Sequence, residues 1–174
     1  LMILFGEGFA DFVANYAPAQ KIPFLPDIAK LERAWRLAYH SADIAPISAE
    51  KLSALPPEQL GDATVSFLPS VALISSPFPV ISLWVAATKM QTLDGIDPQN
   101  GETALIVRPE LDVNVHNVPK DLADPILAII HGETLNHAAE IGLANNDNFD
   151  FSAMFSLLIQ TGAIANIILD TKGT

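Results

Sequence analysis

The chain has 174 residues, of which half are apolar and 17% are charged, and its formal net charge is −11. This composition provides for a substantial core and argues against wholesale disorder. The acidic balance argues against nucleic acid and anionic membranes as partners. The sequence contains no apolar run of about 18 residues, so no membrane-spanning helix is predicted. The chain has no cysteine, which excludes a disulfide framework and a Cys-ligated zinc site and fits a cytoplasmic protein.

Residues 1–60 are predicted to form a helical domain and a linker. Apolar side chains at spacings of three and four share one face of a first helix. They are Phe5, Phe9, Phe12, Val13 and Tyr16. Pro26 and Asp27 suit the first turn of a second helix, and Ser48 is placed to cap a short third one. The second helix carries the main basic patch of the chain, which consists of Lys30, Arg33, Arg36 and His40.

Residues 61–174 are predicted to form an α+β domain with the element order of a winged helix, a small antiparallel sheet plus three helices. Val65–Ile74 alternates as a strand does, and Pro69 restricts it to a sheet edge or a bulge. Glu102–Arg108 and Leu111–Val118 are predicted as two further strands joined by a tight turn. The second of these alternates strictly, so we expect one buried face and one solvated face.

Three helices are predicted after the sheet. The first centres on Ile126–Ile130, with Pro119 and Pro125 in or before its first turn. Thr134 and Asp150 are the predicted N-caps of the second and third helices. The remaining predicted elements are a helix after Pro79 and a last short strand at Ile164–Leu169.

The nearest approach to a metal cluster is a group of four side chains around the second of these helices. The group consists of His131, Glu133, His137 and Glu140. Zinc and iron sites use such ligands, but the i,i+4 spacing of Glu133 and His137 is that of an ordinary helix-surface pair, and this explanation is favoured. The chain contains no HExxH, no GxSxG and no glycine-rich phosphate loop. No catalytic residue, metal or cofactor is therefore predicted.

The charge of the second half indicates what a winged helix here would bind. Gly101–Thr174 contains three basic residues against ten acidic ones, whereas DNA binding needs Lys and Arg at the phosphates. We therefore expect an extended peptide to add to an open sheet edge, in an apolar groove between Leu111–Val118 and Phe151–Gln160. The predicted peptide contacts are Leu111, Asp112, Val113, Asn114, Val115, His116, Phe151, Met154, Phe155 and Leu158. The alternative, that these residues only pack the domain against itself, stays open at this point.

Three stretches of the chain together resemble one family. They are Gly6–Phe12, then Leu25–Glu32 with Ala38–His40, and then Leu68–Val71 followed by Ser75–Val80 and Leu83-Trp84. This pattern resembles the HvfC/BufC-type proteins, which have long been labelled as DNA-binding proteins. The resemblance covers essentially the whole chain. It implies a partner subunit of a multinuclear non-heme iron enzyme that modifies ribosomally made, Cys-containing peptides, and it implies a further helical segment upstream of Leu1.

The second half is similar, more loosely, to the PqqD-like peptide-recognition domain. That resemblance implies that a leader peptide adds as a strand beside Leu111–Asn117 and packs against Phe151–Gln160, with Val65–Ile74 as the first strand of the sheet.

Two functional hypotheses result. The first is a non-catalytic accessory subunit, which binds a precursor peptide through the winged-helix half and contacts the iron enzyme through the helical half, at the basic patch. In this hypothesis the iron belongs to the partner. The second is a DNA-binding transcriptional regulator that uses the basic residues of Lys30–Arg36.

Overall fold

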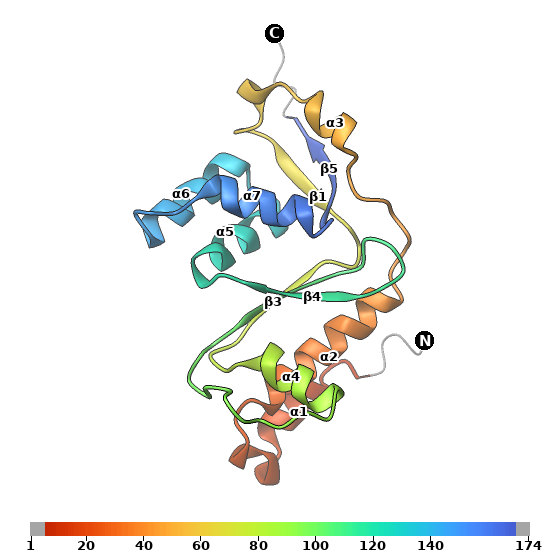
Figure 1. The fold of residues 1–174 in the computed structure, drawn as a ribbon, viewed down its shortest axis with the longest axis vertical. Helices are drawn as coiled ribbons and strands as arrows, with labels where there is room; N and C mark the ends of the chain where they lie inside the picture. Colours follow the sequence, from red (N-terminus) through yellow and green to blue (C-terminus); the bar gives the residue numbers. More distant parts are fainter. Residues whose placement is uncertain (1–5, 170–174) are drawn as a thin grey trace.

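The computed structural model describes residues 6–169, which form helices and two small antiparallel sheets (Figure 1). The predicted α+β class agrees with this architecture. In the first 60 residues the three predicted helices are present, and Ser48 caps the third by accepting a hydrogen bond from the Lys51 N–H. The helices are α1 (Phe9–Asn15), α2 (Leu25–Tyr39) and α3 (Ala49–Ser53), with short 3₁₀ turns at Ala17–Lys21 and Pro57–Gln59. Phe5, which we placed on the first helix, lies outside the described residues.

The strand predicted at Val65–Ile74 is in fact two strands in two different sheets. Strand β1 (Thr64–Phe67) pairs with β5 (Ile164–Ile168), and β2 (Ala72–Ser75) pairs with β3 (Thr103–Val107). The break falls at Pro69, which has no N–H to donate to a ladder. The Val71 N–H instead bonds to the Leu68 carbonyl and closes a turn.

The second sheet has three strands in the order β2-β3-β4, and β4 (Asn114–Val118) is shorter than predicted. We expected this strand to begin at Leu111, but residues 109–112 form a wide bend and Leu111 is 78% exposed. The guanidinium of Arg108 donates to the Glu110 carbonyl at 3.0 Å and so holds the bend. The tight turn predicted here was therefore wrong in length.

The helices that follow agree with their sequence signals, with one exception. Thr134 and Asp150 accept the N-capping hydrogen bonds predicted for them. Pro125 was expected in or before the first turn of its helix, but it lies inside the helix. The helix starts earlier than its apolar centre indicated, and the missing Pro125 N–H leaves the Asp121 carbonyl without its i+4 bond. The helices are α4 (Val80–Thr88), α5 (Lys120–Ile130), α6 (Leu135–Asn145) and α7 (Phe151–Gln160).

The three-stranded sheet lies between two groups of helices, with α1, α2 and α4 on one side and α5–α7 on the other (Figure 1). Strand β3 is buried along its whole length, and its side chains alternate between two cores. Ala104 and Ile106 pack against Leu31 of α2, whereas Leu105 and Val107 belong to the core that α5–α7 complete. The helical segment before residue 61 is therefore packed directly on the sheet that follows it.

Candidate functional site

Strand β4 is an edge strand, and its register shows which main-chain groups are available for pairing. At the end of the β2–β3 ladder the Ser76 N–H donates to the Glu102 carbonyl. The even-numbered residues of β3 therefore direct their main-chain N–H and C=O groups toward β2. The odd-numbered residues of β3 then bond toward β4, where Leu105 faces His116. It follows that the N–H and C=O groups of Val115 and Asn117 point away from the sheet. Among residues 6–169, no strand pairs with this edge.

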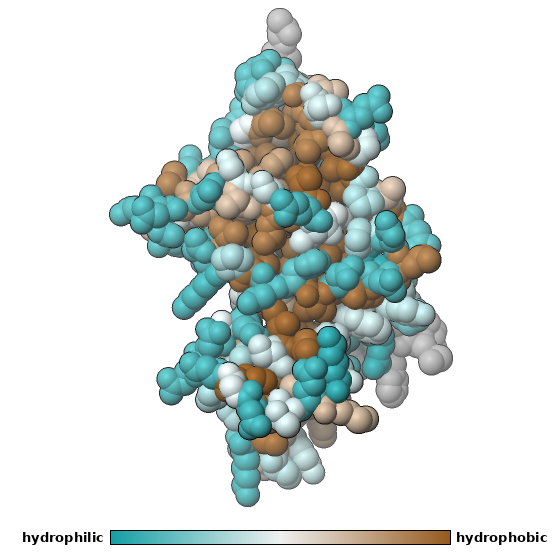
Figure 2. Space-filling model, in the orientation of Figure 1, coloured by the Kyte–Doolittle hydropathy of each residue, from teal (hydrophilic) through white to brown (hydrophobic). Residues whose placement is uncertain are grey.

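A groove of about 620 Å³ lies between this edge and α7. Its lining contains apolar and neutral polar side chains and no charged one. The lining residues are His116, Asn117, Pro119, Leu122, Ala153, Ser156, Leu157, Gln160 and Thr161. Figure 2 shows hydrophobic surface gathered along the middle of this face of the molecule, in the region of α7. The groove joins an edge that is unpaired among residues 6–169 to an uncharged wall, which is less apolar than the wall that the sequence predicted.

The side chains that α7 presents to the groove differ from those that we predicted. Met154 and Leu158 are 0% exposed and fill the core. Phe151 and Phe155 stack on each other at 5.9 Å and line a separate hollow of about 310 Å³ with residues of α6 and the loop at Leu60. The apolar stripe of the helix therefore faces inward. The groove is lined by a less apolar face of α7, which consists of Ala153, Ser156, Leu157 and Gln160.

The predicted contacts on the strand divide in a similar way. Val113 and Val115 pack toward the α2 core, Leu111 and Asp112 lie in the bend, and Asn114 is exposed. Of the six predicted strand residues only His116 lines the groove. Asn117 lines it as well, and alternation gave no signal for it, because the period of two places Asn117 on the same face as Val113 and Val115.

His116 is the titratable side chain of this groove. Burial lowers the pKa of the His116 imidazole below its ordinary value of 6.5, because the charged form loses hydration. The neutral form therefore predominates near pH 7, and the groove wall stays uncharged.

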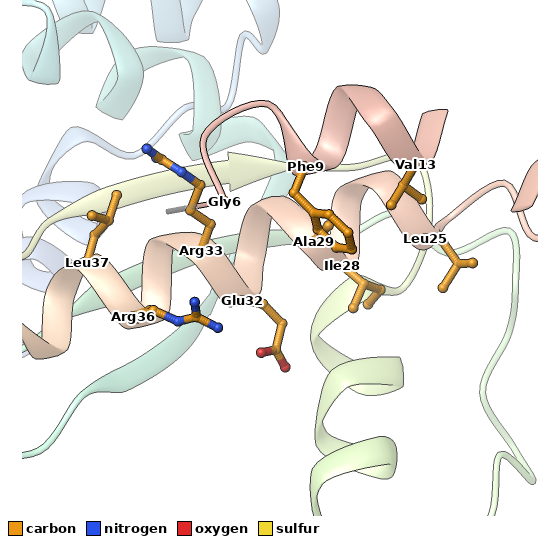
Figure 3. Close-up of a pocket in the computed structure, with 10 residues that line it drawn as sticks. All are labelled: Gly6, Phe9, Val13, Leu25, Ile28, Ala29, Glu32, Arg33, Arg36 and Leu37. Carbon is orange, nitrogen blue, oxygen red and sulfur yellow. The ribbon is translucent and has the colours of Figure 1, made fainter. Parts of the chain in front are cut away.

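A second groove, of about 440 Å³, lies between α1 and α2 (Figure 3). Phe9 and Val13 of α1 form one wall, and α2 provides most of the rest. The lining residues from α2 are Leu25, Ile28, Ala29, Glu32, Arg33, Arg36 and Leu37. In Figure 3 the Arg33 side chain extends away from Phe9, and that of Arg36 extends toward Glu32. This groove is apolar at one end and cationic at the other.

The structure separates the four residues of the predicted basic patch. Lys30 is paired with Asp27 at 2.8 Å. Arg33 is half-buried, and its Nε has no hydrogen-bond partner within residues 6–169. Arg36 and His40 are exposed. Arg33 and Arg36 both line the α1–α2 groove, whereas Lys30 and His40 do not.

The histidines and carboxylates near α6 form a surface pair. His137 Nδ1 lies 3.3 Å from Glu140 Oε2, and both side chains are at least half exposed. Within residues 6–169 there is no group of three side chains placed to hold a metal ion. Across the same residues, every helix is too short or too polar to cross a membrane.

Comparison of the chain with protein-family models gives no match, and comparison with curated proteins gives none either.

Proposed function

We propose that this chain is a non-catalytic accessory subunit that binds a ribosomally made precursor peptide and presents it to a multinuclear non-heme iron enzyme. The observation that carries the proposal is the free edge of β4 beside an uncharged groove. We interpret the sheet β2–β4 with α5–α7 as a winged-helix-like, PqqD-like recognition domain, in which the peptide adds as a strand beside β4 and rests on α7. The family resemblance of the sequence motifs supports the same function.

The energies are consistent with a moderate affinity. Val115 and Asn117 offer two outward N–H and two outward C=O groups, and each main-chain bond contributes about 0.5–1.5 kcal/mol net. Those bonds alone give weak binding. Burial of peptide side chains on Leu122 and Leu157 adds about 25 cal/mol for each Å² of apolar surface removed from water. We therefore expect a dissociation constant of about 1 μM.

The decisive variant is Asn117→Pro, because it removes one outward N–H without removing a bond of the β3–β4 ladder. Edge strands tolerate proline where the N–H faces solvent, so the fold is expected to persist. Titration of the precursor peptide, followed by calorimetry, should show about two- to tenfold weaker binding than the matched control Asn117→Ala, which keeps the N–H, since one main-chain bond contributes about 0.5–1.5 kcal/mol. Equal affinities for the two variants would refute pairing at this edge. No binding by the wild-type protein would remove the proposal itself.

The contact with the enzyme is assigned to the helical side, at Lys30, Arg33, Arg36 and His40. In this proposal the iron is held by the partner, so metal analysis should detect iron in the enzyme and in the complex but not in this subunit. Copurification of the two proteins tests the contact. Stoichiometric iron in the isolated subunit would contradict the assignment.

DNA binding is the second candidate function, and the exposure of Arg36 and His40 on α2 is the observation in its favour. Phosphate contacts make affinity fall steeply with salt. A DNA-binding protein should therefore show salt-dependent affinity that weakens in Arg33→Ala and Arg36→Ala. The pairing of Lys30 with Asp27 and the partial burial of Arg33 reduce the charge available for this role, which is why the peptide proposal is preferred.

A further inference from the structure

The face of α2 that lines the α1–α2 groove is a stripe with helical spacing, and α1 covers only part of it. The stripe residues recur at intervals of three and four from Leu25 to Leu37, which places them along one side of the helix. In Figure 3, Phe9 and Val13 lie over the part of the stripe near Ala29 and Leu25. Leu37 lies beyond the end of α1. The part of the stripe that residues 6–169 leave uncovered fits the packing of another helix.

The stripe carries two arginines and one glutamate, and neither arginine has an ion-pair partner among residues 6–169, although the chain contains 20 acidic residues and only 9 basic ones. Glu32, the one acid on the stripe, accepts a hydrogen bond from Trp84 Nε1 at 2.8 Å. The buried Arg33 Nε has no acceptor, and such a donor costs free energy until an acceptor reaches it.

We propose that this α2 stripe docks an amphipathic helix of a partner protein, one that presents an apolar face to Ile28 and Leu37 and carboxylates to Arg33 and Arg36. A helix is the occupant whose side-chain spacing matches the stripe, and acidic side chains complement the two guanidinium groups. The inference rests on the proposed function at one point, since it specifies the chemistry of the enzyme contact assigned to α2. The β4 groove has no part in it.

A displayed library of helical peptides about 18 residues long tests this proposal, because peptides of that length can hold a helix in isolation. Each peptide carries a Leu/Ala stripe, and its flanking positions are randomised among Glu, Lys and Gln. We expect selection on the wild-type protein to enrich peptides with Glu beside the apolar stripe. Enrichment without regard to charge, or none at all, overturns the proposal.

A charge exchange sharpens the test. The variant Arg36→Glu should bind the best acidic helix at least about tenfold more weakly and should regain affinity for the same helix with Lys in place of the facing Glu. Lys51→Glu, at an exposed position on α3, is the matched control and should leave affinity unchanged. Circular dichroism of each variant confirms folding. Loss of binding to both helices in a folded Arg36→Glu protein contradicts a direct charge contact.

The failure of this inference is separable from failure of the proposed function. If the iron enzyme binds the subunit but a selected acidic helix does not compete with it, the docking inference is overturned and the accessory role stands. If competition occurs but no precursor peptide binds, the docking inference stands and the peptide role fails. Preferential binding of duplex DNA, lost in Arg36→Glu, overturns the docking inference in favour of the regulator.

Discussion

The arginine that follows β3 and the two arginines of α2 differ in their hydrogen bonding within residues 6–169. Arg108 is buried and donates to the Ala38 carbonyl at 2.9 Å and to the Ser41 carbonyl at 2.6 Å, and it pairs with Asp43 at 2.7 Å. Arg33 and Arg36 have no ion-pair partner within residues 6–169. The first side chain ties the C-terminal end of α2 to the sheet, whereas the other two border an open groove.

The same contrast separates the buried carboxylate of Glu102 from the outward edge of β4. The buried Glu102 accepts from the Ile81 and Ser82 N–H groups at 2.7 and 2.9 Å and is satisfied within the chain. The outward groups of β4 are not paired with another strand within residues 6–169. Polar groups that the chain satisfies by itself hold the fold together, and the outward groups of β4 are those that we propose a partner to pair with.

Replacement of Arg108 is the change with the largest expected effect. Arg108→Ala should lower the free energy of unfolding by about 3–5 kcal/mol, since the carbonyls of Ala38 and Ser41 lose their donors inside the protein. Arg36→Ala is the matched control and should change it by less than about 0.5 kcal/mol. Urea denaturation of both variants provides the comparison. If Arg108→Ala lowers the free energy of unfolding no more than Arg36→Ala does, Arg108 does not join α2 to the sheet.

Replacement of Glu102 should lower the free energy of unfolding by less than replacement of Arg108 does. The carboxylate bonds the first N–H groups of α4, where the helix dipole also favours a negative charge. Glu102→Ala should lower the free energy of unfolding by about 2 kcal/mol, since hydrogen bonds to charged groups contribute about 1.5–3 kcal/mol. Glu58→Ala, at an exposed position, provides the control in the same urea experiment. If both variants unfold at the same urea concentration, the capping role of Glu102 is wrong.

Much of the fold was predictable, because it depends on local signals. The capping residues Thr134 and Asp150 lie where their side chains satisfy helix N–H groups. The predicted alternation of a buried and a solvated face agrees with Val113, Asn114 and Val115, but not with His116, which is half-buried, or with Leu111, which is exposed. The split at Pro69 was not predicted, because the partners of the two halves are β5 and β3, far away in the sequence. Periodicity identifies a strand but does not choose its sheet.

The sequence predicted a groove between the last strand of this sheet and the last long helix, but most of the residues that line the observed groove were not among those predicted. The pairing of a free strand edge with the last long helix followed from element order and from the family resemblance. The helix face was wrong, because the most apolar stripe, with Met154 and Leu158, fills the core. A groove open to solvent is lined by residues such as Ser156 and Gln160, which a search for apolar spacing passes over.

A large side chain placed in the β4–α7 groove tests whether the precursor peptide binds beside the outward edge of β4. Ser156 is exposed on the groove side of α7, so Ser156→Trp should occupy the groove without disturbing the core. The affinity for precursor peptide should fall at least about tenfold, or about 1.4 kcal/mol. Ala144→Trp, at an exposed position on α6, controls for the added indole. Unchanged affinity in Ser156→Trp would place the peptide elsewhere.

Titration of His116 should give the smallest effect. The pKa of the folded-state imidazole lies below its ordinary value of 6.5 because of burial. As the pH falls below 6.5, the unfolded chain takes up a proton before the folded chain does, so the stability contributed by the neutral imidazole decreases until the folded-state pKa is reached. We therefore expect a small loss of stability as the pH falls from above 6.5 toward the folded-state pKa, measured as the free energy of unfolding in urea at each pH.

A bound peptide removes more water from His116 and should lower its pKa further, so peptide affinity should also fall over this interval. In His116→Gln both pH dependences should be reduced, whereas His131→Gln, at an exposed position, controls for the loss of one imidazole. NMR titration of the imidazole with and without peptide measures the two pKa values directly. A pKa that rises on peptide addition would mean that an acidic group of the peptide reaches His116, and the groove would then select charged rather than neutral side chains.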